Sequence, residues 1–175
     1  MEEKENILRI FRETKEALSR GDAAKIKNLS NQTTNTASLT HDPDNIAVAV
    51  IVYALSKIIE REDYKSLPGW NNFYKTYMTA INNIVIALEK NDEKNFRINI
   101  EIIRKSINKL SGKLKNYIQD VFRKASINKA SRIYEHGISM EKTAKLLGVT
   151  LFELANYAGG KEATDIPETM TISVG

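Results

Sequence analysis

The side chains best suited to acid–base chemistry in this sequence are its two histidines, His41 and His136. His41 lies between a threonine and Asp42, with Asp44 just beyond a proline, a grouping that suits a metal or acid–base site but more often caps a helix. His136 follows Arg132 by four positions, which places both side chains on one helical face, where a solvated pair near the helix end is the usual outcome. We therefore expect neither histidine to form a catalytic or metal site.

Other reactive constellations are missing from the 175 residues. The sequence has no cysteine, which excludes disulfides, thiolate metal ligands and a cysteine nucleophile. It also lacks a glycine-rich phosphate loop, a Ser/His/Asp set and carboxylates at metal-ligand spacing. We expect a protein that is not an enzyme and that holds no cofactor and no metal. The polar residues 31–36 suit either a binding groove or the exposed face of a weakly packed helix.

Positive charge is concentrated in one part of the chain. The net charge is +4, but residues 1–100 contain 14 basic and 14 acidic side chains, whereas residues 101–145 contain 11 basic and 4 acidic ones. Residues 146–175 contain one lysine and four acids. This distribution is typical of an electrostatic footprint on a polyanion, although the solvated face of two helices gives the same pattern.

Residues 136–159 have the pattern of a helix-turn-helix, which needs a small residue where the helices cross and a turn residue that tolerates positive φ. Ala144 and Gly148 meet those two needs. Thr150 and Glu153 form a capping box at the start of the second helix. An ordinary helical hairpin that completes the bundle uses much the same residues. The remaining positions that lock the two helices together are Leu147, Val149, Leu154 and Tyr157.

The start of the second helix is poorly suited to recognising DNA bases, because Leu151 and Phe152 are apolar and Glu153 is occupied in capping. Contact with DNA would therefore depend on phosphate-binding cations, on free amides at the helix start and on one amide side chain. The residues we expect to contact nucleic acid are Lys129, Arg132, Lys142, Lys145, Thr150 and Asn156. If the segment does not bind DNA, Leu151 and Phe152 mark the site of a protein partner.

The same segment resembles the helix-turn-helix core of small prokaryotic antitoxins of the UPF0175 type. The matching residues are Gly137, Ile138, Ser139, Ala144, Leu147, Gly148, Val149, Glu153 and Leu154. The resemblance covers about 30 of the 175 residues. It implies a bacterial or archaeal regulator that binds DNA and engages a toxin partner through its C-terminal tail. The preceding 130 or so residues depart from those small proteins.

Helical periodicity extends over most of the chain. Breaks are expected at Arg20-Gly21, at residues 41–45, at 63–69, near Asn91-Asp92 and at Ser111-Gly112. The segment from residue 45 to 60 is apolar on most sides and is the expected central buried helix. We detect no internal repeat. The longest apolar run, residues 46–55, is about half of a bilayer span, and the first residues read as an amphipathic helix rather than a signal peptide, so we expect a cytoplasmic protein without a membrane contact.

These observations predict an all-α protein, a bundle of five or six long helices followed by a helix-turn-helix and a short tail. The predicted parts are a bundle over residues 1–135 for interaction or dimerisation, the helix-turn-helix over 136–159 and the tail over 160–175. The favoured function is a nucleic-acid-binding regulator of the transcription-factor or antitoxin kind. The alternative is a protein-interaction module whose helix-turn-helix and tail dock a partner such as a toxin.

Overall fold

The computed structural model describes residues 3–40 and 43–134, with side chains for 3–33, 44–45 and 47–129. This part of the chain forms six α-helices and contains no strand. The predicted all-α bundle of long helices is therefore confirmed here, while the predicted helix-turn-helix (136–159) and tail (160–175) lie outside the described residues. The helices are α1 (Lys4–Ser19), α2 (Ala23–Thr40), α3 (Pro43–Glu60), α4 (Trp70–Glu89), α5 (Glu93–Asn108) and α6 (Gly112–Tyr134).

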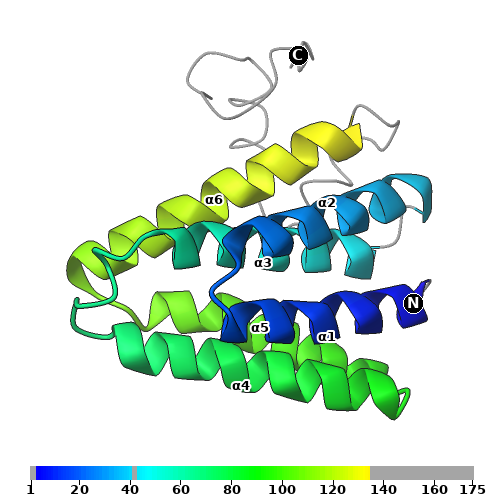
Figure 1. The fold of residues 1–175 in the computed structure, drawn as a ribbon, viewed down its shortest axis with the longest axis horizontal. Coiled ribbons are helices and arrows are strands. Elements are labelled where there is room, and N and C mark those ends of the chain that lie inside the picture. The colour runs from blue at the N-terminus through cyan, green and yellow to red at the C-terminus, as the bar shows by residue number, and fades with distance from the viewer. Residues whose placement is uncertain (1–2, 41–42, 135–175) are drawn as a thin grey trace.

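The six helices lie in two layers, with α2, α3 and α6 in one and α1, α4 and α5 in the other (Figure 1). Within the layers α2 packs along α3 and α4 packs along α5, while α1 joins the layers by contacting both α2 and α4. Isoleucine, leucine and aromatic side chains from all six helices form one continuous core. The breaks between helices fall where glycine, proline and capping residues were expected from the sequence.

Helix α3 is the buried central helix that its apolar sequence predicts. From Ala47 to Leu55 every side chain except that of Tyr53 is buried. Two side chains of other helices donate hydrogen bonds to its carbonyl oxygens, Ser30 Oγ to Ala49 at 2.8 Å and the Tyr77 hydroxyl to Ile51 at 2.7 Å. These bonds satisfy polar groups within the core. Apolar as α3 is, none of the described helices is long and hydrophobic enough to cross a membrane.

The turns between α1 and α2 and between α4 and α5 have the same structure. Gly21 and Asn91 adopt left-handed φ angles of 65° and 57°, which glycine and asparagine tolerate best. The amide of the following residue, Asp22 or Asp92, donates to the carbonyl oxygen five residues earlier, at 2.9 and 2.8 Å. Oδ1 of each aspartate then caps the next helix by accepting from the amide three residues later, at 3.0 and 3.1 Å.

The two helical hairpins that contain these turns, α1–α2 and α4–α5, form a repeat at an offset of 70 residues, as Asp22 and Asp92 show. The sequence shows no repeat here, because the matching positions share burial more than residue type. The third helices do not continue the match, because α3 packs along α2 whereas α6 packs mainly on α3 rather than along α5. The pairs buried in both copies include Ile7/Tyr77, Ile10/Ala80, Phe11/Ile81, Ala17/Ala87, Leu18/Leu88, Ile26/Phe96 and Thr33/Ile103.

At one pair of matched positions, one hairpin has an apolar residue and the other has a polar residue. Leu29 in α2 is fully buried, and its counterpart in α5 is Asn99, which is 6% exposed. The Asn99 side-chain nitrogen donates to the carbonyl oxygen of Asn95 at 2.8 Å. Its Oδ1 is buried without a hydrogen-bond partner among the described residues. A buried acceptor in this state destabilises the fold, so Asn99 is a costly residue at a position where the other copy has leucine.

Candidate functional site

Most of the residues predicted to contact nucleic acid or a partner follow the last described helix. Lys142, Lys145, Thr150 and Asn156 lie outside the described residues, as do the predicted partner contacts Leu151 and Phe152. His41 and His136 lie outside them too. Arg132 falls within α6, although its side chain is not described. Lys129 is the member of the set whose side chain the structure does place.

Lys129 lies in the interior of the bundle, with 0% of its surface exposed. Its Nζ lies 4.4 Å from the ring centroid of Tyr53 in α3 and 3.3 Å from Oδ1 of Asn31 in α2. An ammonium over an aromatic face and beside an amide oxygen is stabilised by both, which offsets part of its desolvation. The predicted phosphate contact by Lys129 is therefore corrected: this side chain joins α6 to α2 and α3 and does not reach the surface.

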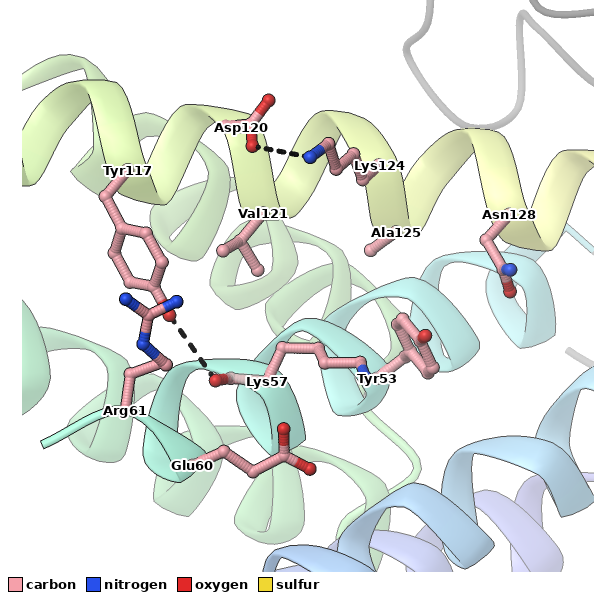
Figure 2. Close-up of a pocket in the computed structure, with 10 residues that line it drawn as sticks. All are labelled: Tyr53, Lys57, Glu60, Arg61, Tyr117, Asp120, Val121, Lys124, Ala125 and Asn128. Carbon is pink, nitrogen blue, oxygen red and sulfur yellow. Dashed lines mark hydrogen bonds and ion pairs between the residues drawn. The ribbon is translucent and has the colours of Figure 1, made fainter. Parts of the chain in front are cut away.

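A cleft of about 290 Å³ opens between α3 and α6, close to Lys129 along the chain (Figure 2). Its lining residues recur every three or four positions on each helix, so each helix turns one face toward the cleft. Figure 2 shows Val121 and Ala125 pointing from α6 toward α3, where Lys57 and Tyr53 lie. The lining residues from α3 are Tyr53, Lys57 and Glu60, and Arg61 directly follows that helix. The lining residues from α6 are Tyr117, Asp120, Val121, Lys124, Ala125 and Asn128.

Three side chains close one end of the cleft. The rings of Tyr64 and Tyr117 stack with centroids 3.6 Å apart and planes 3° apart, and the Arg61 guanidinium lies 5.1 and 5.6 Å from the two centroids. Asp63 holds Arg61 in place through hydrogen bonds of 3.2 and 3.1 Å. Burial raises the pKa of the Tyr117 hydroxyl to about 12, although the nearby Arg61 charge acts in the opposite direction. This cluster fixes the segment after α3 against α6.

The charges around the cleft are unevenly paired. On α6, Asp120 binds Lys124 at 3.1 Å and Arg123 at 2.9 Å. On α3, Lys57 has its Nζ 5.5 Å from the Tyr53 ring centroid and forms no ion pair with any described residue. Glu60 points away from α6 in Figure 2. Lys57 is therefore the lining cation on α3 whose charge is not paired among the described residues, whereas the charge of Arg61 is paired with Asp63.

The described residues contain no group of three His, Cys, Asp or Glu side chains that could hold a metal ion. The sequence analysis did not identify Tyr53, Arg61 or Tyr117 as site residues. A signal was present, because Tyr117, Val121 and Ala125 recur every four positions and so form one helical stripe. What the sequence did not indicate is which helix the stripe would face.

No family model, curated protein or solved structure matches this chain. Its function has to be argued from its own residues.

Proposed function

We propose that the protein is a nucleic-acid-binding regulator in which the helical bundle carries a C-terminal helix-turn-helix. The observation that carries the proposal is the positive charge of residues 101–145, with 11 basic and 4 acidic side chains, which continues into the helix-turn-helix pattern of residues 136–159. The antitoxin-like residues of that pattern support the same conclusion. Helix α6 ends at Tyr134, and the segment follows it closely in the sequence.

The proposed contacts are mainly with phosphates. With Lys129 buried in the bundle, the proposed phosphate contacts are Arg132, Lys142 and Lys145, together with the backbone amides at Thr150. Asn156 is the proposed base contact, since amide side chains pair well with adenine. One amide gives little sequence information, so the binding should be strongly salt-dependent and weakly sequence-specific.

Fluorescence anisotropy with a short labelled duplex tests the proposal. Affinity should fall steeply as salt rises from about 50 to 200 mM, and the variant Lys142→Glu/Lys145→Glu should reduce the slope of log affinity against log salt by about 2. The matched control is Lys27→Glu/Lys75→Glu, which reverses two exposed lysines on α2 and α4 and should leave DNA binding nearly unchanged. Undetectable binding at low salt, or equal loss in both variants, would contradict the proposal.

The second candidate function is a protein-interaction module, in which Leu151 and Phe152 dock a partner and the tail after residue 160 adds to the contact. The apolar start of the second helix favours it, because those two residues suit a protein surface better than a DNA groove. A toxin-like partner and a homodimer are the assemblies it implies. Deleting residues 160–175 should then release a co-purifying protein while leaving the melting temperature of the bundle unchanged.

A further inference from the structure

Two adjoining shallow depressions lie along the exposed side of α5. The first, of about 540 Å³, is lined by Lys94, Arg97, Ile98, Glu101, Ile102 and Lys105. The second, of about 350 Å³, shares Ile102 and Lys105 with the first and continues between α5 and α4 past Phe73 to Ser111. The helical part of this stretch, residues 94 to 108, corresponds to about 21 Å at the helical rise of about 1.5 Å per residue. We call this continuous feature the α5 surface.

The α5 surface is apolar where the fold does not require it. Ile98 and Ile102 are 43% and 39% exposed. Their counterparts in the other copy of the repeat are Asn28 and Gln32, and there the Gln32 amide donates to Asn28 Oδ1 at 2.8 Å on the surface of α2. Amide side chains in the α1–α2 hairpin therefore occupy the positions that isoleucines occupy in the α4–α5 hairpin. A pair of exposed isoleucines one turn apart, in a place where the other hairpin has amides, is the apolar element of a candidate docking surface.

The rim of the α5 surface is basic. Lys94, Lys105 and Lys109 form no ion pair with any described residue. Arg97 binds Asp44 at 2.9 Å, and Glu101, the acidic residue on this rim, binds Arg104 at 3.3 Å. The α5 surface thus combines three ammonium groups without ion pairs and two exposed isoleucines, beside the buried ring of Phe73. This combination determines which kind of partner surface can bind there. Its complement is an apolar ridge flanked by carboxylates.

We propose that the α5 surface binds an acidic amphipathic helix of a partner protein, with apolar residues three or four positions apart seated on Ile98 and Ile102. A helix packed along α5 matches the length of the surface, and its acidic flanks would pair with the free lysines. A second copy of this chain fits less well, because antiparallel α5 helices paired at Ile98 and Ile102 bring Lys94 of one beside Lys105 of the other. A nucleic acid fits less well too, because isoleucines offer no aromatic face on which bases stack.

The test uses a designed helical peptide with leucines on one face and glutamates on both flanks, measured by fluorescence anisotropy against the full chain. The variant Ile98→Asn/Ile102→Gln copies the residues of the other repeat half, so the bundle should keep its circular dichroism and melting temperature. It should lose affinity for the peptide by about tenfold or more. A peptide with lysines in place of the glutamates should not bind, and Lys94→Glu/Lys105→Glu should exchange the preference between the two peptides.

Three results would overturn the proposal. The first is binding of the acidic peptide that survives Ile98→Asn/Ile102→Gln. The second is a concentration-dependent dimer in sedimentation that the same variant abolishes, which would make a second copy the occupant. The third is duplex or single-stranded DNA binding that Lys94→Glu/Lys105→Glu abolishes, which would make the surface a nucleic-acid site. Since Lys142→Glu/Lys145→Glu leaves the α5 surface intact, failure of the DNA-binding proposal and failure of this one are distinguishable.

Discussion

Replacing Asn99 with leucine should stabilise the bundle, because the other copy of the repeat already has leucine at this position. Asn99 is 6% exposed, and its Oδ1 has no hydrogen-bond partner among the described residues. A buried acceptor left unpaired costs about 1–3 kcal/mol. Leucine has the same number of non-hydrogen side-chain atoms and the same branching as asparagine, so the substitution nearly conserves shape.

The expected gain follows from what the substitution removes. Loss of the Asn99 hydrogen bond to the Asn95 carbonyl costs about 1 kcal/mol, which offsets part of the benefit. Burying two methyl groups in place of the amide adds to it. We expect a net increase of about 1–2 kcal/mol in the free energy of unfolding, or a rise in melting temperature of roughly 2–8 °C for a chain of this size.

Urea unfolding followed by circular dichroism measures this change. The control is Asn83→Leu at an exposed position of α4, which reports the higher helix propensity of leucine without any change in burial. The reasoning is refuted if Asn99→Leu gains no more than Asn83→Leu. That result would mean that the Asn99 oxygen is satisfied in solution or that leucine does not fit.

Further predictions follow from the capping turns, the buried lysine and the tyrosine cluster. Asp22→Ala and Asp92→Ala should each cost about 1 kcal/mol in urea unfolding, and the double variant should lose the sum if the two turns are independent. Lys129→Met keeps most of the buried stem and should leave the salt dependence of DNA binding unchanged; an altered salt dependence would mean that Lys129 contacts nucleic acid. Lys129→Ala should lower the free energy of unfolding by about 2 kcal/mol or more. Because the pKa of Tyr117 is raised to about 12 in the folded state and is near 10 when unfolded, its contribution to stability is complete below about pH 10 and is lost as the pH rises toward 12. Unfolding free energies measured from pH 9 to 11.5 should therefore fall more steeply for the unmodified chain than for Tyr117→Phe, and equal slopes would contradict the assigned shift.

The helices and their breaks could be predicted from sequence because the signals are local. Asp22 and Asp92 cap helices, Gly21 and Asn91 end them, and the apolar run of α3 indicates a buried helix whatever surrounds it. The match between the two hairpins could not be predicted in this way, because pairs such as Leu29 and Asn99 differ in residue type and share their burial and their place in the hairpin.

The candidate sites were harder to predict from sequence, because each site depends on which helices pack together. Lys129 lies on a basic stretch of sequence, and charge alone suggested a surface position. Its burial results from the contact of α6 with α3, which places the Tyr53 ring over the ammonium. The isoleucines of the α5 surface are a different case. Ile98 and Ile102 lie off the helical stripe of Phe96, Ile100, Ile103 and Ile107, so the sequence itself indicates that they face outward, as the structure shows.

The order in which the bundle folds can be inferred from how far apart in the sequence the packed helices are. The α1–α2 and α4–α5 hairpins and the pairing of α2 with α3 bring together segments that are close in sequence, so their loop-closure entropy is small. The contacts of α1 with α4 and of α3 with α6 join residues about 70 positions apart and close much longer loops. We expect the hairpins to form early and the docking of one half on the other to limit the folding rate. Substitutions in the α1–α4 or α3–α6 contacts should then affect unfolding more than folding, which would make the docked arrangement the main source of kinetic stability.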